Sequence, residues 1–234
     1  RADQTGKEDS YREIFRVLFL IVTPIIFSSF IYNINGYING VMYSELAGRQ
    51  GVNSEVVSTL YGEYSVYFLT IINIPLTLAG AAPTSMIPEV SALYAQHRRK
   101  AARRKIDEAT QLSMFISIPA AVGLAVLAYP ITRLLFPNTN GTAGTLLLIG
   151  AVTIIFNTNS NVSNGVLQGI GKANLPMWNA AIALVINVGL LVALLQLTSL
   201  GIYAVLVATI VYSIVICILN DISMKKYIHY KNPW

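Results

Sequence analysis

The sequence predicts an all-α integral membrane protein, a bundle of six transmembrane helices, on the strength of two observations. Of the 234 residues, 54% are hydrophobic and only 12% are charged, whereas a soluble domain carries about 25% charged residues. The charges are also grouped, which leaves long stretches without ions. A charge at the centre of a bilayer costs roughly 2.5 to 3.5 kcal/mol, so grouping of this kind is typical of a membrane protein.

The charge-free stretches give the helices in order. Each of the first four can hold one helix of about 20 residues, the length that crosses about 30 Å of hydrocarbon. The stretch from Lys172 to Asp221 is much longer and contains a turn-like break near Gly201, so it holds two helices. The expected spans are residues 17–43, 64–87, 112–135, 146–169, 177–197 and 202–220. A cytoplasmic linker segment, 1–16, precedes them, and a cytoplasmic tail, 221–234, follows.

Lysine and arginine set the expected orientation. Basic residues gather before the first span, in the second loop and after the last span, whereas the other side has only Arg49 and Arg133. Cytoplasmic loops carry an excess of Lys and Arg, so both ends of the chain are expected in the cytoplasm. The net charge of +5 has this origin and does not indicate a nucleic-acid partner. The basic run of the second loop has two explanations. It acts only as the signal that keeps this loop in the cytoplasm, or it also binds anionic lipid head groups or a pyrophosphate. The candidate residues for such binding are Arg98, Arg99, Arg103 and Arg104.

Residues suited to catalysis or metal binding are scarce. The single cysteine, Cys217, and the two histidines, His97 and His229, stand far apart in the chain, which favours neither a disulfide nor a metal cluster. The six expected spans contain no acidic residue and no histidine, so a general base or proton relay within the membrane is not expected. We therefore expect no catalytic residue, no metal and no cofactor, and a protein that is not an enzyme.

Amide and hydroxyl groups take the place of charges within two spans. They stand at i, i+4, i+7 and i+11, which places them on one stripe of a helix. The first span carries Ser28, Tyr32, Asn35 and Asn39, and the fourth carries Asn157, Asn161, Asn164 and Gln168. An unpaired amide in an apolar medium costs roughly 1 to 3 kcal/mol, so each stripe requires either a hydrated cavity or hydrogen bonds between helices. We interpret the double stripe as the lining of a substrate cavity, with hydrogen bonds between helices as the alternative.

Several short motifs, taken in their order and spacing, resemble a known family. They are Ile87-Pro88-Glu89-Val90-Ser91, the basic run after it, Ile118-Pro119-Ala120-Ala121 and Leu167-Gln168-Gly169-Ile170-Gly171-Lys172. Together they are similar to the polysaccharide and peptidoglycan-precursor flippases. The nearest branch contains the stage V sporulation protein B and lipid II flippase-like proteins, within the multidrug, oligosaccharidyl-lipid and polysaccharide exporter superfamily.

The resemblance implies the C-terminal six-helix lobe of a two-lobe exporter in the bacterial cytoplasmic membrane. Such a protein would move an undecaprenyl-pyrophosphate-linked oligosaccharide or peptidoglycan precursor across the membrane by alternating access. Its partners would be membrane lipids, the lipid-linked saccharide and the N-terminal lobe of the same protein. The resemblance does not identify the coupling ion, because several family members carry an acidic residue in the first helix of this lobe, near a cation site, and this chain has Asn33, Asn35 and Asn39 there.

Three other functions are the alternatives to a flippase. A multidrug or toxin cation antiporter of the same superfamily would be expected to show an intramembrane acid, here or in the other lobe. A membrane-embedded transferase would need clustered acidic residues or histidines elsewhere in the protein. A scaffold that transports nothing is the third alternative.

The expected orientation is testable by cysteine labelling. In a Cys217→Ser background, single cysteines at Gln50 and Asn140 should react with an impermeant thiol reagent added to intact cells. A cysteine at Ala101 should react only after lysis. Reaction of the Ala101 variant from outside would reverse the orientation.

Overall fold

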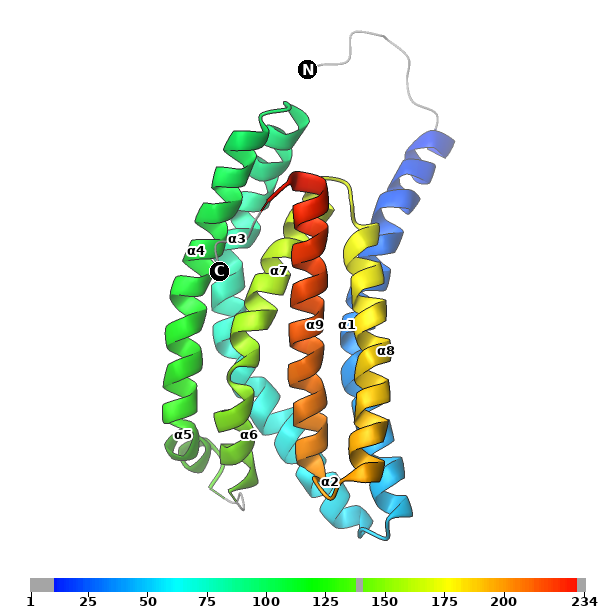
Figure 1. Ribbon diagram of the computed structural model, residues 1–234, viewed down its shortest axis with the longest axis vertical. Helices are drawn as coiled ribbons and strands as arrows, with labels where there is room; N and C mark the ends of the chain where they lie inside the picture. Colours follow the sequence, from blue (N-terminus) through cyan, green and yellow to red (C-terminus); the bar gives the residue numbers. More distant parts are fainter. Residues whose placement is uncertain (1–10, 138–140, 231–234) are drawn as a thin grey trace.

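The computed structural model describes residues 11–137 and 141–230, and these residues form a bundle of long helices that run nearly side by side (Figure 1). The helices are α1 (Tyr11–Arg49), α2 (Ser54–Gly62), η1 (Glu63–Phe68), α3 (Leu69–Ala95), α4 (Arg99–Val126), α5 (Ala128–Leu135), α6 (Thr142–Gly150), α7 (Thr153–Gly169), α8 (Asn174–Leu197) and α9 (Ile202–Ile228). η1 is a π-helical segment, and it joins α2 and α3 into one continuous helix of 42 residues.

The expected all-α membrane bundle is confirmed. Within the described residues, five helices are long and apolar enough to cross a membrane, and the number is six if the bent pair of α6 and α7 forms one span. Many large apolar side chains point outward, Phe19, Phe115 and Val185 among them, as expected of helices that face lipid. The bilayer boundaries of the six spans stay a prediction. Of the expected linker and tail, residues 1–10 and 231–234 lie outside the described part of the chain, and so does Asn140.

The helices extend beyond the expected spans, so several charged residues that marked span ends lie inside them. Glu63 and Glu89 belong to the 42-residue helix, and Asp221 belongs to α9. A helix continues past the hydrocarbon wherever its backbone remains hydrogen-bonded, and one charged residue does not stop it.

The fourth expected span, 146–169, is two helices, α6 and α7, bent by 49° at residues 151–152. The Thr153 hydroxyl donates to the carbonyl oxygen of Gly150 at 2.7 Å. The next backbone bonds, from the Ile154 and Ile155 amides, reach back only three residues instead of four. The side chain and the tightened turn together redirect the helix at this point.

Helix α9 is the central helix of the bundle. Half of its most apolar 18-residue stretch is buried inside the protein, compared with 7% for α1. It packs on α7 and α8, while α1 packs mainly on α8, and α3 packs on both α4 and α7. Figure 1 shows α9 between α7 and α8, with α1 at the edge of the bundle.

Two hydrophobic clusters fill opposite ends of the bundle. The larger one joins η1 to α6, α8 and α9. It contains the rings of Tyr64 and Phe68, which stack with centroids 5.4 Å apart, and the ring of Tyr61 packs against it, tilted, 5.7 Å from that of Tyr64. The other joins α3, α4, α7 and the end of α9 around Ile106 and Met224. The loop between α8 and α9 contains Gly201 at φ +55°, at the position where the sequence predicts a break.

Gly150 tests the packing of the larger cluster. A Cβ atom there would lie 2.2 Å from the ring of Phe68 and 2.9 Å from Leu206. We expect Gly150→Ala to destabilise the protein by about 1 to 3 kcal/mol through overpacking, measured as a lower melting temperature in detergent. Gly189→Ala is the matched control, because no atom lies within 4 Å of its Cβ position in α8. An unchanged melting temperature for Gly150→Ala would contradict this packing.

Candidate functional site

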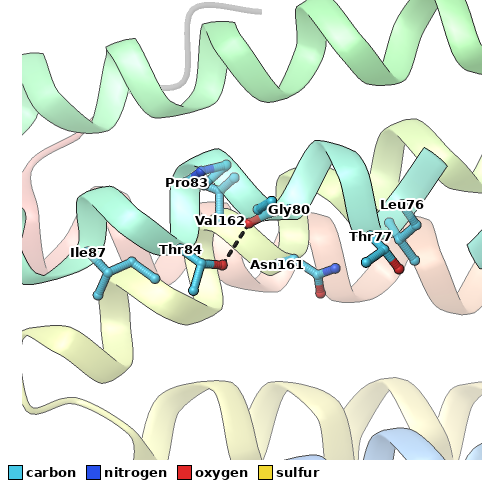
Figure 2. Close-up of a pocket in the computed structure, with 9 residues that line it drawn as sticks. Leu76, Thr77, Gly80, Pro83, Thr84, Ile87, Asn161 and Val162 are labelled. Atoms are coloured by element: carbon cyan, nitrogen blue, oxygen red, sulfur yellow. Dashed lines mark hydrogen bonds between the residues drawn. The ribbon is translucent and has the colours of Figure 1, made fainter. Parts of the chain in front are cut away.

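A groove of about 520 Å³ lies between α3 and α7 (Figure 2). Its lining combines small, apolar and uncharged polar residues: Leu76, Thr77, Gly80, Ala81, Pro83, Thr84, Ile87, Asn161 and Val162. The hydroxyl groups of Thr77 and Thr84 donate to the carbonyl oxygens four residues earlier, those of Asn73 and Gly80, at 2.7 Å each. Each hydroxyl oxygen can still accept a hydrogen bond from a ligand. The groove therefore offers hydrogen bonds without a net charge.

Glycines on α7 set how closely α3 approaches beside the groove. A Cβ atom on Gly165 would lie 2.2 Å from Ile87 Cδ1, and one on Gly169 would lie 2.5 Å from Ser91 Oγ. Small residues of this kind let membrane helices pack closely. The groove occupies the neighbouring part of the same helix pair, where Gly80 and Ala81 leave space on α3.

A network of buried amides ties α7, α8 and α9 together. The amide of Asn220 donates to Ser160 Oγ and to Asn164 Oδ1, both at 2.8 Å. The amide of Asn179 donates to Asn220 Oδ1 at 2.8 Å and to Ser223 Oγ at 3.0 Å. Hydrogen bonds between helices are worth about 0.6 kcal/mol each on average in membranes. The network fixes the rotation of α7, which in turn directs Asn161 toward α3.

A second polar contact joins α7 to α9 beside this network. The amide of Asn159 donates to the two carboxylate oxygens of Asp221 at 3.3 and 3.4 Å and to Cys217 Sγ at 3.2 Å. Asp221 is therefore held by a neighbouring helix.

The four candidates on α7 have different surroundings. Asn161 is exposed in the groove and Asn164 is buried in the network, while Asn157 and Gln168 are half-buried. Their assignment to a substrate cavity stays a prediction. For Asn164, the hydrogen bond from Asn220 matches the alternative reading, a contact between helices.

The candidates on α1 lie against α8. Ser28, Asn35 and Asn39 are buried, and the side chain of Tyr32 lies outside the described part of the structure. Neither polar atom of Asn39 has a hydrogen-bond partner, and the same is true of Asn187 on α8, which is 0% exposed. Ile31 packs against the cluster that contains Ala180 and Ala183, and the Gln50 amide donates to the Leu195 carbonyl. Because α1 and α8 run in the same direction, Asn39 and Asn187 lie between these two contacts along the helix pair.

Tyr61 of α2 packs against two glycines of α1, Gly36 and Gly40. The Tyr61 hydroxyl donates to the Gly36 carbonyl oxygen at 2.7 Å, and its ring occupies the position that a Cβ atom of Gly40 would take. Helices α1 and α7, which carry the two polar stripes, are not among the extensively packed helix pairs.

The basic run lies at the end of α3 and the start of α4, and its four candidate arginines differ in their contacts. Arg103 Nε donates to the Ile228 carbonyl at 2.9 Å, and Arg104 pairs with Glu108 at 3.4 Å. Arg98 and Arg99 are exposed, and Arg99 lies over the ring of Tyr94 at 5.3 Å. Arg98 and Arg99 are thus the two candidates that are more available to a phosphate or a lipid head group.

Sequence reasoning missed Thr77 and Thr84 in the groove and the partner amides Asn179, Asn187 and Asn220. The groove threonines carry a weak signal, because they flank Gly80 and Pro83 in an apolar run. The amides occur singly or eight residues apart in their helices, without a stripe. Across residues 11–137 and 141–230, no group of three or more His, Cys, Asp or Glu side chains could hold a metal ion.

Comparison with known proteins places these features in a family. The MatE family model matches residues 24–193. Lipid II flippase MurJ of Bacillus subtilis (strain 168) is 27% identical over 197 residues, which is 80% of this chain and 35% of that protein. Stage V sporulation protein B of the same organism is 20% identical over 215 residues, 92% of this chain and 41% of that protein.

A third relative is a probable lipid II flippase MurJ from Rhizobium meliloti (strain 1021), 29% identical over 45% of this chain and 20% of that protein. The chain thus spans well under half the length of these relatives. No solved structure matches the chain.

The amide network generates a stability prediction. Replacing Asn220 with leucine removes two donors and one acceptor, and should lower the free energy of unfolding by more than the roughly 0.6 to 1.7 kcal/mol of one such bond. Asn164→Leu should show a loss within that range. Asn174→Leu is the control, because this residue is exposed at the start of α8. The stability of the three variants is compared by their melting temperatures in detergent. Equal melting temperatures for Asn220→Leu and Asn174→Leu would rule out the network as a stabilising contact.

Proposed function

Because the chain belongs to the MatE family, we propose that it forms one lobe of a flippase for a lipid-linked saccharide, built into the bacterial cytoplasmic membrane as a multi-pass protein. The lobe faces a second six-helix lobe of the same protein, and the two open alternately to either side. The relatives named as lipid II flippases support this substrate class.

The groove between α3 and α7 is the observation that carries the proposal. Its lining has no charged residue, yet it offers the Asn161 amide and the Thr77 and Thr84 hydroxyls beside apolar side chains. A saccharide presents hydroxyl groups, which bind amides and hydroxyls through hydrogen bonds. The threonine methyl groups and Pro83 add apolar surface against which the sugar ring can pack.

The pyrophosphate needs a different part of the protein. A phosphate group prefers arginine and lysine, and the groove contains neither. Arg98, Arg99 and Lys100 are exposed at the cytoplasmic end of the expected topology. We assign them to the first encounter with the anionic head group, together with anionic membrane lipids. The saccharide then enters the groove as the lobes rearrange.

Asn161 gives a direct test in the intact protein reconstituted in liposomes. Asn161→Leu should reduce flipping of a fluorescent lipid-linked saccharide by about two- to tenfold, the effect of losing one hydrogen bond of about 0.5 to 1.5 kcal/mol. Its melting temperature should stay near that of the wild type, because the side chain is exposed.

Asn174→Leu supplies the matched control for the same chemical change outside the groove, and it should flip at the wild-type rate. Thr84→Val should resemble Asn161→Leu, since it removes a hydroxyl and preserves the volume. Wild-type flipping by both groove variants would remove the groove from the substrate path.

A further inference from the structure

A further pocket, of about 370 Å³, lies between α1 and α2. Its lining consists of Tyr37, Gly40, Val41, Ser44, Glu45 and Tyr61. The five lining residues of α1 recur at spacings of three and four, which places them on one face of that helix, opposite the buried Asn35 and Asn39. Figure 1 shows α2 at one end of the bundle and the turn between α3 and α4, which carries the basic run, at the other.

Tyr61 forms a fixed wall of the pocket. Its hydroxyl is hydrogen-bonded to the Gly36 carbonyl, and its ring lies against Gly40. The same ring lies 6.3 Å from that of Tyr43 and 5.7 Å from that of Tyr64, measured between centroids. These contacts hold the ring in place before any ligand arrives, so binding against it costs little ordering of the side chain.

The α1 side of the pocket has an aromatic end and a polar end. Tyr37 exposes 72% of its surface, and the face of an aromatic ring attracts the polarised C–H groups of a sugar. Glu45 stands eight residues further on, about 12 Å along the helix. Its carboxylate and the neighbouring Ser44 hydroxyl can accept hydrogen bonds from sugar hydroxyls. The pocket therefore offers the two kinds of surface that a saccharide needs.

The charges at the pocket favour a neutral ligand. Glu45 pairs with Arg49 on the next turn of α1 at 3.8 Å, and both side chains are exposed. The lining itself contains no lysine or arginine, so a phosphate would meet a carboxylate without a basic residue beside it. An organic cation would compete with Arg49 for that carboxylate. A sugar hydroxyl can donate to Glu45 while the pair with Arg49 persists.

The pocket is separate from the groove between α3 and α7. Both use the continuous helix Ser54–Ala95, but Tyr61 precedes Leu76, the first groove residue, by fifteen positions. This separation is about 22 Å along the helix. The groove also lies on the side of the basic run, because its α3 residues continue toward the turn between α3 and α4.

We propose that the pocket between α1 and α2 is a second saccharide site, which binds the sugar rings after they leave the groove. The proposal rests on the proposed function, since it takes the transported head group as the ligand. Tyr37 and Tyr61 pack against the sugar, and Glu45 and Ser44 accept from its hydroxyls. The neutral saccharide is thus passed from one end of the lobe to the other without binding to a basic residue.

The test is photochemical cross-linking in the intact protein, purified in detergent. A photoreactive p-benzoylphenylalanine replaces Val41 in the pocket, and the probe is a radiolabelled disaccharide linked to undecaprenyl pyrophosphate. We expect an adduct at this position, and an excess of the free disaccharide, without lipid, should suppress it. The matched control carries the same group at Val185, which is 72% exposed on α8. Any adduct there comes from the lipid chain, so the free disaccharide should leave it unchanged.

Variants of the lining show which groups hold the sugar. Tyr37→Ala should raise the concentration of free disaccharide needed for suppression by about two- to tenfold, while Tyr37→Phe should preserve the wild-type value because the ring makes the contact. Glu45→Gln should raise it by about two- to tenfold, since a neutral acceptor binds a hydroxyl more weakly than a carboxylate. Glu55→Gln is the control, because Glu55 is exposed on α2 and outside the pocket.

Three results would overturn the second site: no adduct at Val41, an adduct that the free disaccharide does not suppress, or wild-type suppression in both Tyr37→Ala and Glu45→Gln. The second of these would show that a lipid chain occupies the pocket. The flipping assay separates this proposal from the proposed function. Suppression by the free disaccharide in a protein that does not flip would leave the pocket standing alone, and flipping without suppression would remove the pocket only.

Discussion

Asn220 forms three hydrogen bonds between helices, and the packing of three helices depends on it. It donates to Ser160 and Asn164 and accepts from Asn179, so one amide on α9 fixes both α7 and α8. In hydrocarbon there is no water to replace these bonds. The rotation of α7 is therefore set from its α9 side, and Asn161 is presented to the groove as a result. The position of Asn161 in the groove thus depends on the hydrogen bonds of Asn220, which lie outside the groove.

The architecture could be predicted because hydrocarbon tolerates few ions. Gaps between charges indicated six crossings, and Gly201 indicated the break between the last two. The same reasoning placed Glu63 at a span boundary, since sequence alone does not distinguish a charge at the membrane surface from one buried among neighbouring helices. The bend at residues 151–152 was also hidden, because it results from the Thr153 hydroxyl and from the tightened turn at Ile154 and Ile155.

The sequence predicted which helix faces of the candidate site are polar, but not what those faces contact. A stripe at i, i+4, i+7 and i+11 shows that one helix face is polar, but the partner of that face lies elsewhere in the chain. Asn161 and Asn164 share a stripe and are only three residues apart, yet one lines the groove and the other accepts from Asn220. The two surroundings differ because α3 stands on one side of α7 and α9 on the other. The spacing of polar residues in one helix does not indicate which helix packs on each of its sides.

The central position of α9 also bears on the order of synthesis. It is the last of the described helices to leave the ribosome, yet it supplies Asn220, the acceptor for Asn179 and the donor for Ser160 and Asn164. Until it is inserted, the earlier helices lie in the bilayer with these groups deprived of their native partner. The chain therefore passes through a stage of synthesis in which α7 and α8 are inserted but the hydrogen bonds that join them to Asn220 cannot yet form.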